Sequence, residues 1–217
     1  CAGEEEVSES LRFSNPHYFA AGATLFGTEA QGAYEYEGQS YNGRNLHVEG
    51  FATCLECHDG HSLELEEENC FTCHAAAADG GLEAIRITAG DFDGDGDEAE
   101  GMAGEVETMA EKLFEAIQIY AADVAGSPIV YDPHSYPYFF VDTNADGEVS
   151  EGEAVRDNGY ASWTPALLRA VYNYTWAQKD PGAFAHNGQY MLQVLYDSLN
   201  DIGDTAGMTR PAVAASE

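Results

Sequence analysis

Cys54-Leu-Glu-Cys57-His58 and Cys70-Phe-Thr-Cys73-His74 are two copies of one pattern, C-x-x-C-H, in a chain of 217 residues. The pattern is typical of covalent attachment of a c-type haem. Two thiols three positions apart can bond to the two vinyl groups of one porphyrin, and the histidine that follows can reach the iron. The sequence therefore predicts two haems, attached through Cys54, Cys57, Cys70 and Cys73, with His58 and His74 as the proximal iron ligands.

A structural zinc site is the competing interpretation of these cysteines, because C-x-x-C pairs also form tetrahedral sulfur sites. Zinc would leave both adjacent histidines unexplained, and the two pairs lie closer together in the sequence than is usual for zinc sites. A disulfide framework is a third alternative. Two patterns that both end in histidine favour haem.

The composition limits the classes of partner. The net charge is −31, with only 8 Lys and Arg residues, so nucleic acid is excluded as a partner, because phosphate contacts need cationic side chains. Charge-driven binding to anionic lipid is disfavoured for the same reason. Hydrophobic residues make up 44% of the chain, which is enough for the core of one domain, with or without an appendage.

The first residue is Cys1, followed by an acidic stretch. This beginning resembles that of a mature bacterial lipoprotein, which implies lipidation at Cys1 and a tether or assembly arm over residues 1–12. The alternative is that the sequence simply starts there. No apolar run reaches the roughly 18 residues needed to span a bilayer, so we expect membrane contact only through a lipid anchor. Export to the cell surface or beyond suits c-type haem, which is attached outside the cytoplasm.

Apolar periodicity predicts a mostly α-helical fold with much irregular structure, a haem-centred core and C-terminal helices. Apolar residues recur at helical spacing over 105–122 and 188–202, and Thr164 followed by Pro165 predicts a helix start. A short helix is expected over 18–26. Residues 33–42 alternate aromatic and polar side chains around a glycine, which predicts a small β-hairpin near the N-terminus, whereas 126–141 is expected to be extended or irregular.

These elements suggest a division of the chain into four parts. After the N-terminal arm, residues 13–90 form the di-haem segment. Residues 91–203 form the calcium-loop and helical part of the same domain, and residues 204–217 form a C-terminal tail.

Two acidic stretches predict calcium sites. Residues 142–153 fit the EF-hand loop pattern at every defined position. The expected oxygen donors are Asp142, Asn144, Asp146, Glu148 through its carbonyl, and Glu153 through both carboxylate oxygens. Residues 91–97 match the first half of the pattern, with Asp91, Asp93, Asp95 and Asp97 as donors. Position twelve of that loop is Met102, so Glu100 or Glu105 must close the site; a solvated acidic turn is the alternative.

The arrangement around the two C-x-x-C-H patterns resembles multihaem c-type cytochromes. His61 follows the first pattern as C-x-x-C-H-x-x-H, and such a histidine serves a neighbouring haem in that family. His47 resembles the upstream ligand histidine of small multihaem cytochromes, and His17 is the other candidate for the first haem. The segment around His186 resembles ligand segments of larger multihaem enzymes, so His186 is a further candidate, whereas His134 is interpreted as structural.

The resemblance extends to exported di-haem cytochromes with calcium sites, including those that polymerise into extracellular filaments. It implies electron transfer to redox partner proteins, to an extracellular acceptor, or to further copies of the chain, which surplus histidines could link. Two histidines on each iron would leave no substrate site and would keep the potential low. The alternatives are a haem enzyme, such as a peroxidase or nitrogen-oxide reductase, and a calcium-dependent assembly protein.

Overall fold

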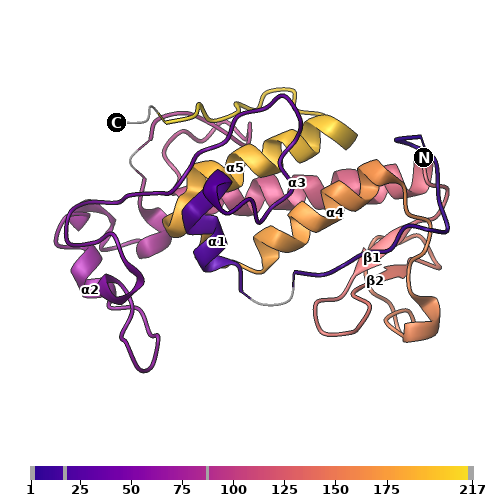
Figure 1. Ribbon diagram of the computed structural model, residues 1–217, viewed down its shortest axis with the longest axis horizontal. Helices are drawn as coiled ribbons and strands as arrows, with labels where there is room; N and C mark the ends of the chain where they lie inside the picture. Colours follow the sequence, from indigo (N-terminus) through magenta and orange to yellow (C-terminus); the bar gives the residue numbers. More distant parts are fainter. Residues whose placement is uncertain (1–2, 17–18, 87, 215–217) are drawn as a thin grey trace.

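Three long helices bury most of the apolar core in the computed structural model, which describes residues 3–16, 19–86 and 88–214. They are α3 (Met102–Asp123), α4 (Pro165–Gln178) and α5 (Ala183–Ile202), and α5 packs against both of the others. Figure 1 shows that a lobe carrying the short helix α2 (Glu67–Cys70) lies beside one end of these helices, and that the strands lie at the other end.

Apolar stripes explain the packing of the three helices. Leu113 and Ile117 of α3, Leu167 of α4 and Leu195 of α5 are all 0% exposed. The helices predicted over 105–122, from Thr164 onward and over 188–202 are therefore confirmed. The Thr164 hydroxyl accepts a hydrogen bond from the Leu167 N–H at 3.1 Å, as expected of an N-cap.

The remaining elements are short. The α-helix α1 covers Ala21–Phe26 and lies against α5. The 3₁₀ turns are η1 (Gly27–Glu29), η2 (Cys54–Glu56), η3 (Ala75–Ala77), η4 (Leu82–Ala84) and η5 (Arg156–Asn158). The two strands, β1 (Ile129–Tyr131) and β2 (Phe139–Val141), pair antiparallel with Val130 opposite Phe140.

The small β-hairpin of the predicted fold is present, but its predicted place in the sequence is wrong. It lies within 129–141, whereas residues 33–42 form a turn without strands. Buried amide side chains explain the difference, because they take the backbone groups that a hairpin would pair. Asn173 of α4 accepts from the Tyr34 N–H at 2.8 Å and donates to the Tyr34 carbonyl at 3.0 Å. Gln193 of α5 accepts from the Asn42 N–H at 2.8 Å.

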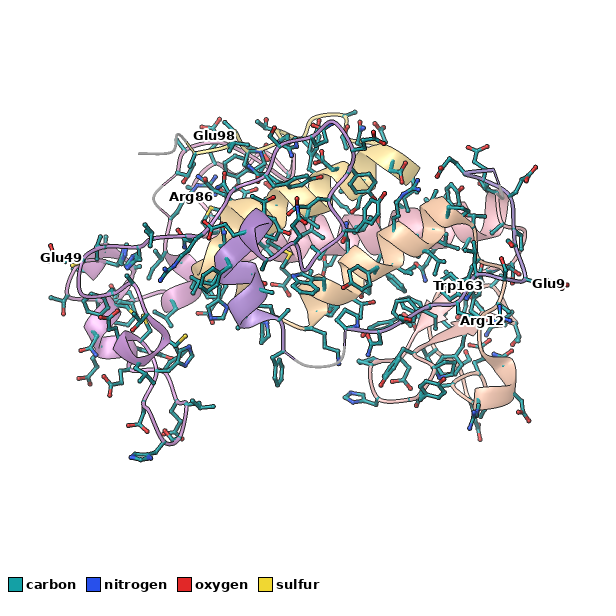
Figure 2. The ribbon with its side chains drawn as sticks, viewed as in Figure 1. Glu9, Arg12, Glu49, Arg86, Glu98 and Trp163 are labelled. Carbon is teal, nitrogen blue, oxygen red and sulfur yellow. The ribbon has the colours of Figure 1, made fainter. Side chains whose placement is uncertain are left out.

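The described part of the N-terminal arm is bound along the helices. The Ala166 N–H donates to the carbonyl of Glu4, and the Ser8 N–H donates to the carbonyl of Trp163. Figure 2 shows Glu9, Arg12 and Trp163 together at the end of the molecule that carries the strands. Cys1 lies outside the described residues.

Within the part of the chain that the structure describes, no helix combines the length and the apolar character that a bilayer span requires.

Candidate haem-binding segment

Both C-x-x-C-H patterns adopt the same local backbone. The His58 N–H donates to the Cys54 carbonyl at 2.8 Å, and the His74 N–H donates to the Cys70 carbonyl at 3.0 Å. Each pattern therefore makes one tight turn, which keeps its two thiols and its histidine on neighbouring positions. The four cysteines of the two patterns form no disulfide within the described residues, and none of them is fully buried.

The segment around these patterns has no core of its own. Among the described residues between 43 and 91, none is buried. Several large apolar side chains in it are instead about half exposed or more, namely Leu46, Val48, Leu55, Leu63 and Leu65. Exposed apolar side chains gathered in one segment mark a binding surface.

The two patterns are tied to each other by the backbone between them. His58 forms an isolated antiparallel bridge with Leu65, and the Glu66 N–H donates to the Cys57 carbonyl at 3.0 Å. Helix α2 follows at once and carries Cys70. Partial burial and then the neighbouring Cys70 raise the pKa of the Cys57 thiol.

The structure brings His186, from the first turn of α5, against His58. Their ring centres are 6.3 Å apart and their planes differ by 32°. The Nδ1 of His58 lies 2.9 Å from the Leu63 carbonyl oxygen, and the Nδ1 of His186 lies 2.8 Å from Asp180 Oδ1. Since a carbonyl and a carboxylate only accept, both Nδ1 atoms carry the proton, and both Nε2 atoms are left as metal-binding lone pairs.

Several groups fix the position of His186. Asp180, whose carboxylate it contacts, is 3% exposed. The Asn45 side-chain amide donates to the His186 carbonyl at 2.8 Å. A Cβ at Gly182 would lie 2.8 Å from His186 Cε1, so the absence of a side chain at Gly182 makes room for the imidazole. Asn187 then leaves the helical conformation and accepts from the Tyr190 N–H, which restarts α5 beyond His186.

A second imidazole pair joins His47 and His74. Their ring centres are 6.0 Å apart, and their planes differ by 25°. Phe51 stands edge-on to His47, with ring centres 6.4 Å apart. The structure thus places His47 beside the second C-x-x-C-H pattern, whereas the sequence spacing had associated it with the first.

Among the described residues, His61 and His134 belong to neither pair. His61 is exposed in the loop that follows the first pattern, where its N–H donates to Asp59. His134 is exposed and donates its N–H to Asp132. His17 lies outside the described residues. The signal for His186 in the sequence is weak: it directly precedes an Asn that caps the main part of a helix.

The donor set and its surroundings fit two c-type haems. If the Nε2 atoms of two imidazoles faced one metal ion from opposite sides, metal–nitrogen bonds of about 2 Å and about 1.1 Å from each nitrogen to its ring centre would put the ring centres about 6.2 Å apart. Both histidine pairs match this spacing. Each pair includes the histidine of one C-x-x-C-H pattern, and the segment that carries the thiols also carries exposed apolar side chains.

The EF-type loop at 142–153 has a regular hydrogen-bond pattern. Asp142 accepts from the N–H groups of Ala145 and Gly147, both of which have positive φ. The Glu153 carboxylate accepts from Thr143 and Ser150, and these bonds, the Thr143 hydroxyl first, lower the pKa of Glu153. The Asn144 side chain accepts from the Asp146 N–H, and the Asp146 side chain accepts from the Glu148 N–H.

The acidic loop that begins at Asp91 repeats this pattern. Asp91 accepts from the N–H groups of Gly94 and Gly96, both with positive φ. Burial, and then the neighbouring Asp93, raise the pKa of Glu100 to about 7. Glu105, in the first turn of α3, also faces the loop and is 0% exposed.

Comparison with known proteins finds similarity to polyheme c-type cytochromes of Geobacter sulfurreducens. The chain is 30% identical to OmcC over 230 residues, which cover 89% of this chain and 27% of the relative. It is 29% identical to OmcB of two strains, over 89% of this chain and 28% of the relative. The names are those of cytochromes, and none is that of an enzyme.

The chain thus spans little more than a quarter of the length of these relatives. No family model matches the chain, and no solved structure matches it. Over most of its length, the chain is similar to part of a polyheme c-type cytochrome.

Proposed function

We propose that the chain carries electrons through two covalently attached c-type haems and is not an enzyme. The observation that carries this proposal is the pairing of one further histidine with each C-x-x-C-H histidine. His58 and His186 would ligate the haem held by Cys54 and Cys57, and His47 and His74 the haem held by Cys70 and Cys73. When bound, haem c supplies a one-electron Fe(III)/Fe(II) couple.

Three kinds of side chain contribute to this function. The thiols hold the porphyrins, and the short link from His58 through Leu65 to α2 keeps the two attachment sites adjacent. The four imidazoles would be the iron ligands that the chain supplies, two for each haem, and would leave no iron site for substrate. The surplus of carboxylates favours the more positive ferric state and so lowers the potential.

Calcium binding, cellular location and assembly also belong to the proposed function. A calcium ion at 142–153 would neutralise the carboxylates of that loop, and an exported protein meets calcium at concentrations that fill even weak sites. We place the protein at the cell surface or outside the cell. Exposed His61 is available to a neighbouring copy, which supports assembly into a conducting filament that passes electrons to redox partners or an extracellular acceptor.

Spectroscopy of the haem-loaded chain tests the carrier function. We expect a pyridine haemochrome assay to count two haems per chain and the ferric protein to be entirely low-spin at room temperature. Cyanide should leave the spectrum unchanged under mild conditions. A high-spin ferric band, or rapid binding of cyanide, would instead assign an open iron site and a haem enzyme.

A further inference from the structure

The loop of residues 91–97 and the first turn of α3 bring together carboxylates with too few cations to balance them. Ligand oxygens of Asp91, Asp93 and Glu105 lie within 4.8 Å of one another, and so do those of Asp93, Asp95 and Glu100. Asp93 belongs to both groups and is 0% exposed. Burial of a charged carboxylate is costly unless it is paired or coordinates a metal.

One carboxylate oxygen in this cluster has no partner. Asp93 Oδ2 is buried and accepts no hydrogen bond, while Oδ1 accepts from the Asp95 N–H at 3.0 Å. The nearby Lys112 ammonium donates to the backbone carbonyl of Asp93, at 2.6 Å. Asp93, whose ligand oxygen belongs to both carboxylate groups, therefore has a buried oxygen without a donor, which is the environment of a cation ligand.

Glu105 occupies the position that Glu153 occupies in the other acidic loop. Glu105 Oε2 accepts from the N–H of Phe92, the second residue of its loop, at 2.9 Å. Glu153 Oε1 accepts from the N–H of Thr143, the second residue of its loop, at 2.7 Å. The last carboxylate of the 91–105 loop therefore comes three positions later than in an EF-hand, because it projects from the first turn of α3.

We propose that residues 91–105 bind a calcium ion, with Asp91, Asp93, Asp95 and Glu105 as its principal carboxylate ligands. The donors are hard oxygens on a flexible loop, which suits calcium better than magnesium, whose octahedral geometry is stricter. Glu100 lies beside Asp93 and Asp95 and supplies a further oxygen. This site is independent of the haems and of the loop at 142–153.

The site joins the haem-binding segment to the helical core. Arg86, at the end of that segment, forms an ion pair with Glu105 at 2.6 Å and donates to the Glu100 carbonyl at 2.9 Å. The Met102 N–H donates to the Ile85 carbonyl at 3.1 Å. Figure 2 shows Arg86 where the chain returns from the lobe to the helices. A bound cation would hold this junction together.

Calcium counting by equilibrium dialysis of the haem-loaded chain tests the site. We expect Glu105→Gln to remove one bound calcium, and Glu153→Gln to remove a different one, so that the double variant binds neither. Glu98→Gln is the matched control, because Glu98 is an exposed carboxylate of the same loop outside both oxygen groups. Unchanged stoichiometry and affinity in Glu105→Gln would overturn the proposal.

A second variant and a second readout keep the test decisive if Glu105→Gln does not fold. Asp95→Asn changes an exposed ligand and should raise the Kd of this site about 10-fold or more, the range seen when metal-site groups are lost. Hydrogen exchange of residues 82–105 should slow when calcium is added, in the wild type and in Glu153→Gln but not in Asp95→Asn. Equal slowing in Asp95→Asn would contradict the assignment, whatever the state of the haems.

Discussion

The ring of His186 lies 6.3 Å from that of His58, although the two residues belong to distant parts of the chain. Each has its Nδ1 committed to an oxygen of the protein, Leu63 for His58 and Asp180 for His186. Orientation of an imidazole by such an outer partner is the usual arrangement around a metal ligand. The pair therefore connects the start of α5 to the first haem attachment site.

Replacement of His186 or His47 should leave one of the two irons without its second histidine ligand. We expect His186→Ala to convert one of the two haems to the high-spin ferric form, and His47→Ala to convert the other. Electron paramagnetic resonance and the absorption bands of the ferric protein measure this change. His61→Ala and His134→Ala are the controls and should remain low-spin; a high-spin His61→Ala protein would reassign the ligand.

Asp180 should tune the potential of the haem beside His186. A carboxylate that accepts from Nδ1–H raises the basicity of the imidazole and so favours ferric iron. We expect Asp180→Asn to raise one of the two midpoint potentials by about 30–60 mV, since 59 mV corresponds to a tenfold change for a one-electron couple. Spectroelectrochemistry resolves the two haems.

The control for Asp180 is a change in net charge alone. Asp204→Asn removes one carboxylate from an exposed turn, where Asp204 accepts from the Ala206 N–H. Its effect on both potentials should be small, because exposed charges are screened by solvent and salt. Equal shifts in the two variants would mean that Asp180 acts only through its charge.

The parts of the fold that follow from local sequence were predictable. Apolar residues on one face predict the three long helices, and Thr164 and Pro165 also predict the start of α4. The haem-attachment residues are contiguous, so their chemistry can be proposed without a tertiary structure. Helix starts and contiguous motifs need only near neighbours along the chain.

The features that depend on distant residues could not be predicted in this way. The segment 33–42 alternates like a hairpin, but Asn173 and Gln193 pair with its backbone instead. The approach of His186 to His58 requires the kink of α5 and the packing of the lobe. The sequence names Glu100 and Glu105 as alternatives that could close this loop, and spacing alone cannot choose between them, because the turn of α3, rather than the length of the loop, brings Glu105 to the cluster.

Removal of calcium should destabilise the protein. A ligand that binds only the folded state at 100 times its Kd adds about 2.7 kcal/mol to the free energy of unfolding. We expect urea unfolding with excess chelator to give a lower midpoint than unfolding with millimolar calcium, and magnesium to restore only part of the difference. In Glu153→Gln the effect of the chelator should be smaller. A midpoint that is independent of calcium in the wild type would contradict a structural role for both loops.

Gly182→Ala should disturb the first haem without touching a ligand. The added Cβ would lie 2.8 Å from His186 Cε1, closer than real Cβ atoms approach, so the imidazole must move from its place opposite His58. The φ of Gly182 is −96°, which alanine adopts without strain, and the effect is therefore steric. We expect partial high-spin character at one haem and cyanide binding there, while the haem beside His47 stays low-spin. Gly22→Ala is the matched control, because its Cβ would meet nothing within 4 Å. A fully low-spin Gly182→Ala protein that resists cyanide would show that His186 does not ligate the iron.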